Sequence, residues 1–296
     1  VTNTTSNPKI TGTFPAALGG TTITDSFKSI SIMTVEGKWD YNGTTIGIRS
    51  GRPYGVDLSY NDGFLTNTSA SIKSSEVGIV AARSLNKNVK VFGGIRLNSF
   101  SGKVAKPYLT QGGDGTGYSY ELENTSSTGF TVGAAYEIPE IYLRASVQYN
   151  SEISHAGTKN VESLDGAAAT TTLQDMKAPG STIIKLRSAV TEKIVLFANW
   201  RTAQWSQFVI SANTHTAMGQ GDLWAPDSGI DYTIGGAMVV SDKLTVLGGM
   251  SRSPSDPDST TESALSPYNG SSTTFLGGTL KAVSYTHLRA HETRIH

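Results

Sequence analysis

Residues 141–150 read IYLRASVQYN and alternate strictly between apolar and polar side chains. The apolar set consists of Ile141, Leu143, Ala145, Val147 and Tyr149. Because successive side chains of a β-strand point to opposite faces, this stretch predicts a strand with one apolar and one polar face. Its length is also that of a tilted strand that crosses a lipid bilayer.

The same alternation recurs along the chain. It is clear at residues 90–100 and 194–201, and weaker copies lie at 27–36, 44–54, 71–83, 128–136, 182–190, 230–240, 244–251 and 273–282. Together these segments predict about eleven strands. Short polar turns, such as 85–88 and 241–243, alternate with long loops rich in Gly, Ser, Thr and Pro at 106–117, 157–180 and 253–272. This alternation of turn lengths is typical of bacterial outer-membrane barrels.

We therefore predict an all-β fold, an antiparallel transmembrane β-barrel, over residues 1–282. A soluble β-sandwich or propeller is the alternative, because alternating strands are expected in those folds as well. The barrel places the chain in the bacterial outer membrane, and that location is inferred from the strand pattern alone, since no signal segment precedes Val1.

Composition restricts the function further. Hydrophobic residues make up 37% and charged residues 16% of the chain, and no apolar run reaches the ~18 residues that a spanning helix needs. Lys and Arg number 24, as do Asp and Glu, so charge gives no indication of a nucleic-acid partner. Cysteine is absent, which excludes disulfides and thiol chemistry.

The C-terminal residues 283–296, VSYTHLRAHETRIH, break the alternation. They contain His287 and His291 at the i, i+4 spacing of a metal pair, but we interpret the segment as a non-native tail and predict no metal site. An even strand number is expected for a single-chain bacterial barrel. An odd count therefore indicates either a miscounted strand or an incomplete chain.

Cations recur on the polar faces of the predicted strands. An arginine that faces lipid at the bilayer centre costs about 2 to 4 kcal/mol, so these side chains are expected to point into the lumen. There they would bind a ligand carboxylate, while aromatic and aliphatic side chains bury its acyl chain. The alternative is that they pair with lumenal acids such as Asp231 and Glu76 and stiffen the wall. The cations are Arg49, Arg96, Arg144, Lys185, Arg187 and Arg201.

Candidates for catalysis are sparse. Outside the tail, the histidines are His155 and His215, both in polar stretches that we interpret as solvated loops. Neither lies near a nucleophile elbow, so we predict no enzyme and no cofactor. An outer-membrane phospholipase is the enzyme alternative.

Several segments together resemble the long-chain fatty acid transporters of the outer membrane, the FadL-type family. They read GRPYGVDLSY (51–60), VFGGIRLNSFSGKV (91–104), GFTVGAAYEIPEIYLRASVQYNSEISH (129–155), LFANWRTAQWSQFVIS (196–211), MSRSPSDP (250–257) and TTFLGGTLK (273–281). The most specific is the tetrad WSQF at 205–208.

The resemblance implies a fourteen-stranded barrel with an N-terminal hatch and a lateral opening at an inward strand kink. This chain would supply about eleven of those strands, the second to the twelfth, and the hatch has no counterpart in it. For the carboxylate of a ligand, the resemblance and the pattern together single out Arg96, Arg144, Arg187 and Arg201. The lateral opening is placed loosely at Gly63, Phe64 and Leu65 or at the Thr/Ser stretch that follows them.

The predicted function is therefore passive, ligand-binding diffusion of long-chain fatty acids or other hydrophobic small molecules, with lateral release. A general diffusion porin and a surface-binding or adhesive barrel are the alternatives; a porin would conduct small polar solutes, whereas a transporter would bind its ligand saturably. The expected partners are a hydrophobic ligand and outer-membrane lipid, and we expect a monomer.

Overall fold

The protein is described by a computed structural model that covers residues 2–6, 11–13, 20, 22–24, 28–61, 63–110, 115–226, 228–254, 265 and 270–280. Nearly all regular structure in this part of the chain is antiparallel β-strand, as the alternation predicted. The strands are β1 (Thr2–Ser6), β2 (Thr11–Thr13), β3 (Thr22–Thr24), β4 (Ile30–Tyr41), β5 (Thr44–Gly51), β6 (Gly55–Ser59), β7 (Ser69–Ser84), β8 (Val89–Lys106), β9 (Tyr118–Ile138), β10 (Leu143–Asn150), β11 (Ile153–Leu164), β12 (Thr170–Ala178), β13 (Ser181–Thr191), β14 (Ile194–Ala203), β15 (Gly229–Val239), β16 (Leu244–Ser253) and β17 (Ser271–Leu280). The single α-helix of the described residues is α1 (Asn213–Ala217), and 3-10 turns lie at Gly63–Leu65, Pro139–Ile141 and Trp205–Gln207.

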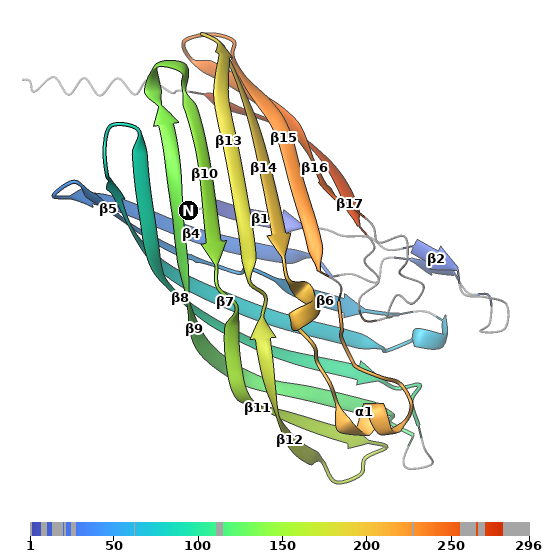
Figure 1. The fold of residues 1–296 in the computed structure, drawn as a ribbon. Helices are drawn as coiled ribbons and strands as arrows, with labels where there is room; N and C mark the ends of the chain where they lie inside the picture. Colours follow the sequence, from blue (N-terminus) through green and yellow to red (C-terminus); the bar gives the residue numbers. More distant parts are fainter. Residues whose placement is uncertain are drawn as a thin grey trace, which may run out of the picture.

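One curved sheet contains most of these strands (Figure 1). Its hydrogen-bonded order is β1-β4-β5-β7-β8-β9-β10-β13-β14-β15-β16-β17, with β6, β11 and β12 attached off this path. Within the described residues, β1 and β17 form the two edges, and no pairing joins them. Most neighbours along the path follow one another in sequence, so local hairpins build much of the wall. β10 pairs with β13 because the β11–β12 hairpin lies between them in sequence.

The outward-facing side chains of β7, β8 and β9 change from apolar to polar at the same height on all three strands. Below it the outward residues are apolar, as Val77, Leu97 and Phe130 illustrate; at it they are Ser75, Ser99 and Ser126. The register aligns these three serines side by side, and the hydroxyl oxygens of Ser75 and Ser99 lie 2.8 Å apart. We call this row the serine level. A shared change from apolar to polar across paired strands is expected where a barrel leaves the hydrocarbon core.

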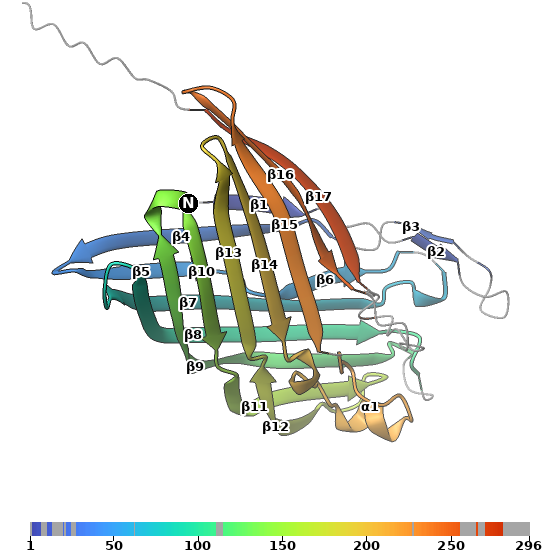
Figure 2. The same ribbon diagram turned by 45° about the horizontal axis from the view of Figure 1, so that its top comes forward.

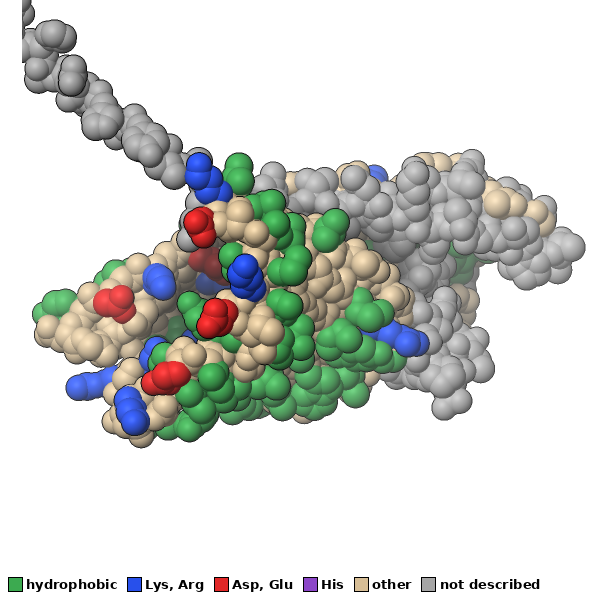
Figure 3. Space-filling model, turned by 90° about the horizontal axis from the view of Figure 1, so that it is seen from above, with side chains coloured by type: hydrophobic (Ala, Val, Ile, Leu, Met, Phe, Trp, Pro, Cys, Tyr) green, Lys and Arg blue, Asp and Glu red, His purple; other side chains and the backbone are tan. Residues whose placement is uncertain are grey.

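On the face drawn in Figure 3, hydrophobic side chains gather in patches over the strands, with polar side chains between them. Many residues of the apolar band below the serine level are large and exposed; they include Ile95 at 63%, Leu97 at 50% and Leu186 at 48%. A soluble protein rarely leaves so many large apolar side chains on one contiguous face. The band therefore fits a surface covered by lipid.

Above the serine level, β8 and β9 continue and their inward faces become buried. Phe100 and Val104 of β8 pack with Tyr118, Tyr120 and Leu122 of β9 in a hydrophobic core. The other side of this core is the segment between β14 and β15, which contributes Phe208, Ile210 and Leu223. The long-loop end is thus a folded cap, in which α1 lies beside β11 and β12 (Figure 2).

The prediction of a long loop at 157–180 is wrong, because β11 and β12 form a hairpin there. β11 also pairs with the start of β9, through Asn160–Leu122 to Leu164–Tyr118, so the hairpin extends the sheet. Its buried side chains include Thr158, Asn160 and Glu162, which alternate in the strand without being apolar. A pattern based on hydrophobicity misses such a strand.

The boundaries of several predicted strands also differ from the structure. The predicted strand at 141–150 begins at Leu143, because Pro139–Ile141 forms a 3-10 turn that ends at Tyr142 with φ 53°. The strand expected at 27–36 instead runs over Ile30–Tyr41. The predicted tail at 283–296 lies outside the described residues.

Candidate functional site

The inward faces of β4, β5, β7, β8, β9, β10, β13 and β14 surround a cavity of about 690 Å³ below the cap. This volume is within the usual range of small-molecule sites. Polar residues such as Thr131, Gln148 and Asn150 share its lining with Ile48, Val80 and Ile183. Its charged residues are Glu36, Lys38, Arg49, Arg52, Glu76, Arg96 and Arg201.

Arg96 is held on three sides. Its Nε and Nη2 atoms donate to Glu76 at 3.1 and 2.7 Å, and Nη1 donates to the carbonyl of Ser151 at 3.1 Å. Only 14% of the side chain is exposed. A two-pronged pair of this kind is a strong charge-assisted contact, and it fastens β8 to β7 and to the start of the β11–β12 hairpin.

A second group of cations surrounds Glu137 near the short turn between β9 and β10. Arg144 Nη1 lies 2.7 Å from one carboxylate oxygen and Lys90 Nζ lies 2.8 Å from the other. Arg187 is the cross-strand neighbour of Arg144 and adds its attraction for Glu137 from farther away. Among the described residues, no carboxylate lies within ion-pair distance of Arg187. The single carboxylate of Glu137 therefore interacts with three cations.

Two further lumenal cations have one acidic partner each. Arg201 lies 3.6 Å from Asp231, and Arg49 lies 3.1 Å from Glu36. The pairing of Arg96 with Glu76 and of Arg201 with Asp231 was the alternative reading of the sequence. A carboxylate-binding role for Arg96, Arg144, Arg187 and Arg201 remains a prediction.

The residues predicted to mark a lateral opening, Gly63, Phe64 and Leu65, form a 3-10 turn in the loop between β6 and β7. Leu65 is buried beside Leu58 and Tyr60, and the ring of Phe64 packs against Tyr108 at 5.0 Å. An opening at these residues likewise remains a prediction.

The wall is interrupted elsewhere. β5 pairs with β7 up to Gly51–Glu76, and β6 resumes the pairing at Gly55–Lys73, so three residues on one strand face two on the other. Pro53 and Tyr54, which lie in this interruption, both line the cavity. Beyond it β6 forms a ladder with β7, and on its other side the Asp57 carbonyl accepts from the backbone N–H of Lys28 at 3.1 Å. β4 pairs with β5 only over 35–41.

Five aromatic side chains close the cavity toward the cap, and we call them the aromatic septum: Tyr54, Phe100, His155, Trp205 and Phe208. The ring centroids of Tyr54 lie 5.6 Å from Trp205 and 6.0 Å from Phe208. Phe100 lies 5.6 Å from Phe208 and 4.5 Å from His155. Tyr54 also lines the cavity, so it is the shared boundary between the septum and the lumen.

Both histidines were predicted to be solvated, and this is wrong, because each is only 1% exposed. His155 lies in β11 against Phe100 of the septum. Burial lowers the pKa of His155 to about 4, so the ring is neutral at neutral pH. The sequence places Ser154 and Ala156 on its two sides, and only the tertiary fold brings the aromatic neighbours.

His215 belongs to a buried polar cluster that fixes the cap. Its Nδ1 lies 2.9 Å from the Gly221 carbonyl and donates to it, so Nε2 accepts from Lys106 Nζ at 2.8 Å. Glu162 accepts from the backbone N–H groups of Asn213 and Thr214 at 2.8 and 2.9 Å. Burial lowers the pKa of His215 and lowers the pKa of Lys106 to about 8.

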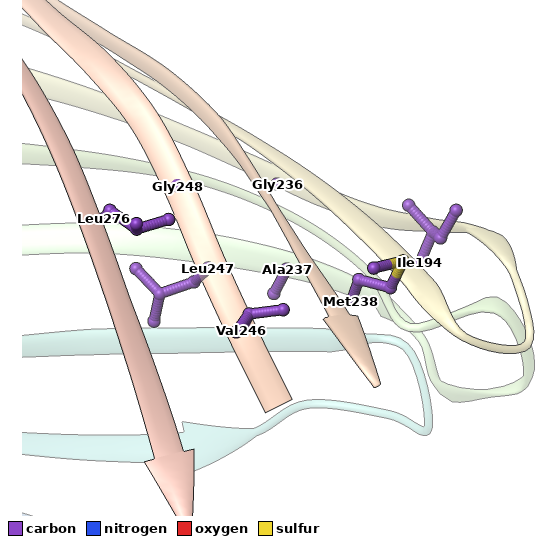
Figure 4. A pocket seen from close by; sticks show the side chains of 8 residues that line it. All are labelled: Ile194, Gly236, Ala237, Met238, Val246, Leu247, Gly248 and Leu276. Carbon is purple, nitrogen blue, oxygen red and sulfur yellow. The ribbon is translucent and has the colours of Figure 1, made fainter. Parts of the chain in front are cut away.

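A separate hollow of about 290 Å³ lies on the wall formed by β14 to β17 (Figure 4). It is entirely apolar, and Met238, Val246 and Leu276 line it on the outward register. Leu276 is 88% exposed there, which again fits contact with lipid.

The part of the chain that the structure describes contains neither a metal-binding cluster nor a helix that could span a membrane. No group of three or more acidic or histidine side chains is arranged to hold a metal ion. No helix in the described part is long and apolar enough to cross a membrane.

No family model matches the sequence, and no curated protein matches it either. Solved structures do match, and they define a class: the described sheet has the fold of the FadL-type β-barrel structures. The resemblance read from the sequence is confirmed at this level.

Three of the matching structures show the extent of the similarity. A FadL homologue from Pseudomonas aeruginosa has 12% identity and a TM-score of 0.63, with 88% of this chain and 67% of that chain covered. The toluene transporter TodX from Pseudomonas putida has 14% identity and a TM-score of 0.61, with 93% and 77% covered. The toluene transporter TbuX from Ralstonia pickettii has 12% identity and a TM-score of 0.56, with 76% and 69% covered.

Proposed function

We propose that this chain forms the wall of a bacterial outer-membrane barrel that takes up hydrophobic small molecules by passive, ligand-binding diffusion. The observation that carries the proposal is the combination of an outward apolar band, which ends at the serine level, with a lumenal cavity behind it. TodX and TbuX, whose fold the described sheet shares, are toluene transporters, which favours transport over catalysis.

A general diffusion porin is disfavoured by the septum and the cap. Phe100, Phe208 and Leu223 are each 1% exposed in a core that spans the long-loop end of the lumen. An open pore needs a continuous wet path, and this core interrupts it.

We place the carboxylate of a fatty acid at Arg187, beside Arg144, because these cations outnumber their acidic partner. Arg187 is the direct cross-strand neighbour of Phe197 on the inward face. The ring of Phe197 stacks near Phe275 at 6.3 Å, so an apolar surface adjoins the charge. A charged headgroup and an acyl chain would both find a partner there.

We infer that lateral release takes place at the interruption between β5 and β6, at Arg52, Pro53 and Tyr54, rather than at the predicted turn Gly63–Leu65. The support is that, in the described residues, no ladder joins β4 to β6 and one backbone hydrogen bond, from Lys28 to the Asp57 carbonyl, reaches this side of β6. A ligand that passes there breaks fewer backbone hydrogen bonds than one that passes through a paired strand.

The function is tested by reconstituting the protein in vesicles and measuring uptake of toluene and oleate against swelling in a small sugar. We expect uptake of the hydrophobic compounds and little swelling. Swelling typical of an open pore would instead support the porin, and uptake no faster than in empty vesicles would leave a binding or adhesive role.

A further inference from the structure

The interruption between β5 and β6 is held to β7 by side chains where the backbone ladder is missing. Its three residues, 52–54, face Ser74 and Ser75 of β7. The Tyr54 N–H donates to the Ser74 hydroxyl at 3.1 Å, and that hydroxyl donates to the Tyr54 carbonyl. Pro53 has no N–H to donate, so no ladder bond can start from it. Side chains change rotamer more readily than a ladder breaks, which makes this the weakest seam of the described wall.

Arg52 completes the seal. Its Nη2 donates to the Ile72 carbonyl of β7 at 2.7 Å, and its Nε donates to the Tyr54 carbonyl at 3.4 Å. Gly55 provides the space for this arrangement, because a Cβ at that position would overlap Nη2 and lie 2.6 Å from the Arg52 Cζ. A single guanidinium therefore ties the interruption to the neighbouring strand.

Arg52 differs from the other arginines of the lumenal cavity in its acceptors. Arg49, Arg96 and Arg201 each have a carboxylate within ion-pair distance. In the described part of the chain no carboxylate lies that close to Arg52, and its acceptors are two neutral carbonyls. A carboxylate is a better acceptor for a guanidinium, because it is charged and accepts two parallel N–H bonds. Arg52 lines the cavity, so a ligand there can reach it.

The height of the interruption suits the exit of an anionic amphiphile. Ser75, which faces the interruption, belongs to the serine level, where the outward side of the wall changes from apolar to polar. A charge is costly inside the hydrocarbon core. A ligand that leaves at this height keeps its headgroup at the polar boundary, while its acyl chain enters the lipid below.

We propose that Arg52 is a latch on the interruption, and that the anionic headgroup of a ligand releases it. The carboxylate takes the guanidinium from the Ile72 carbonyl, and the seam at residues 52–55 opens for the acyl chain. A neutral ligand has no such trigger. The inference rests on the proposed lateral release and adds its regulation; Arg187, near the short turn between β9 and β10, lies at another height and is tested separately.

Hydrogen–deuterium exchange of β6 tests the latch in the folded protein in a non-ionic detergent. Saturating oleate should speed exchange of the amides at 55–59 about five- to tenfold, the factor for one hydrogen bond, whereas methyl oleate should not. Exchange in β8 is the internal reference for global unfolding. Saturation makes the comparison independent of the affinity at Arg187.

Two variants remove the latch in different ways. Arg52→Gln removes the cation, and Gly55→Ala keeps it but places a Cβ where the guanidinium lies. Both should show fast exchange of β6 without ligand and no further response to oleate. Gly47→Ala on β5 is the matched control, because the nearest atoms to its new Cβ are 3.9 Å away, and it should respond to oleate as the unsubstituted protein does.

Equal exchange with oleate and methyl oleate in the unsubstituted protein would overturn the latch. So would a response to oleate that persists in Gly55→Ala, which covers the case that Arg52→Gln does not fold. The latch concerns only how an acid leaves the lumen, so toluene uptake by vesicles decides the proposed function independently: uptake without an exchange response overturns the latch alone, and no uptake of toluene or oleate overturns both.

Discussion

At the scale of single residues, Gly94 shows how tightly the wall is built. A Cβ at this position would lie 2.0 Å from the Ile79 carbonyl oxygen and 2.7 Å from the Val80 Cα, both backbone atoms of the neighbouring strand. Backbone cannot move aside as the end of a side chain can. The close approach of β8 to β7 therefore requires glycine at this point.

We expect Gly94→Ala to lower the free energy of unfolding by about 1 to 3 kcal/mol, as overpacking does. The matched control is Gly78→Ala on the adjacent strand, where the nearest atom to a new Cβ is 3.9 Å away. Urea titration of the vesicle-inserted protein measures both. Equal effects of the two variants would contradict the close packing at Gly94.

Arg96 and Arg187 differ in their partners, so their removal should have different consequences. Arg187→Gln should weaken binding of oleate more than binding of methyl oleate, by about 1 to 3 kcal/mol, because only the acid loses a charge-assisted bond. Arg96→Gln should leave the difference in affinity between oleate and methyl oleate unchanged. It should destabilise the fold, because it leaves the Glu76 carboxylate without its cation. An acid-specific loss in Arg96→Gln would assign carboxylate capture to Arg96 instead.

At the scale of elements, the cap contains two buried histidines whose protonation affects its stability. His155 and His215 both have a pKa lowered by burial, His155 to about 4, against an unfolded value of about 6.5. Between these values the unfolded chain binds the proton and the folded chain does not. Stability is therefore complete above pH ~6.5 and falls as the pH is lowered toward ~4.

We expect acidification through this window to loosen the segment between β14 and β15, which contains Trp205 and Trp224. Tryptophan emission should shift to the red as the pH falls from about 6.5 to 4. In the variant His155→Phe, the free energy of unfolding should fall by about 1 to 3 kcal/mol less over this pH window. The figure follows because a shift of one pKa unit corresponds to about 1.36 kcal/mol. A profile identical to that of the unsubstituted protein would exclude His155 as a source.

The sequence predicted elements with a local period and missed those whose partners are distant. Tyr118, Tyr120 and Leu122 already alternate as apolar residues, and this signal was available to extend β9 to its true start. In contrast, Thr158 and Glu162 carry no hydrophobic signal, because they are buried by contacts with other segments. The burial of His155 and the pairing of Arg96 with Glu76 depend in the same way on which strands become neighbours.

At the scale of the whole molecule, the alternation makes a prediction about the environment of each face. Cysteine in place of Val147 should react with a lipid-soluble reagent, and cysteine in place of Ser146 with an aqueous one, because neighbours along a strand face opposite sides. Val147 is 47% exposed on the outward face. Equal aqueous labelling of both positions in membrane-inserted protein would rule out a lipid-facing wall.

The serine level also determines how deep the wall sits in a bilayer. From Val91 to Leu97 the outward side of β8 is apolar, which at ~3.3 Å per residue and a tilt of ~40° spans a height of about 15 Å. A typical hydrocarbon core is about 30 Å thick, and that of the bacterial outer membrane is thinner than average. Hydrophobic mismatch should thus restrict this wall to thin bilayers, and thicker ones must compress around it. The row of three serines thereby acts as a selector of membrane thickness, independently of any ligand that the lumen carries.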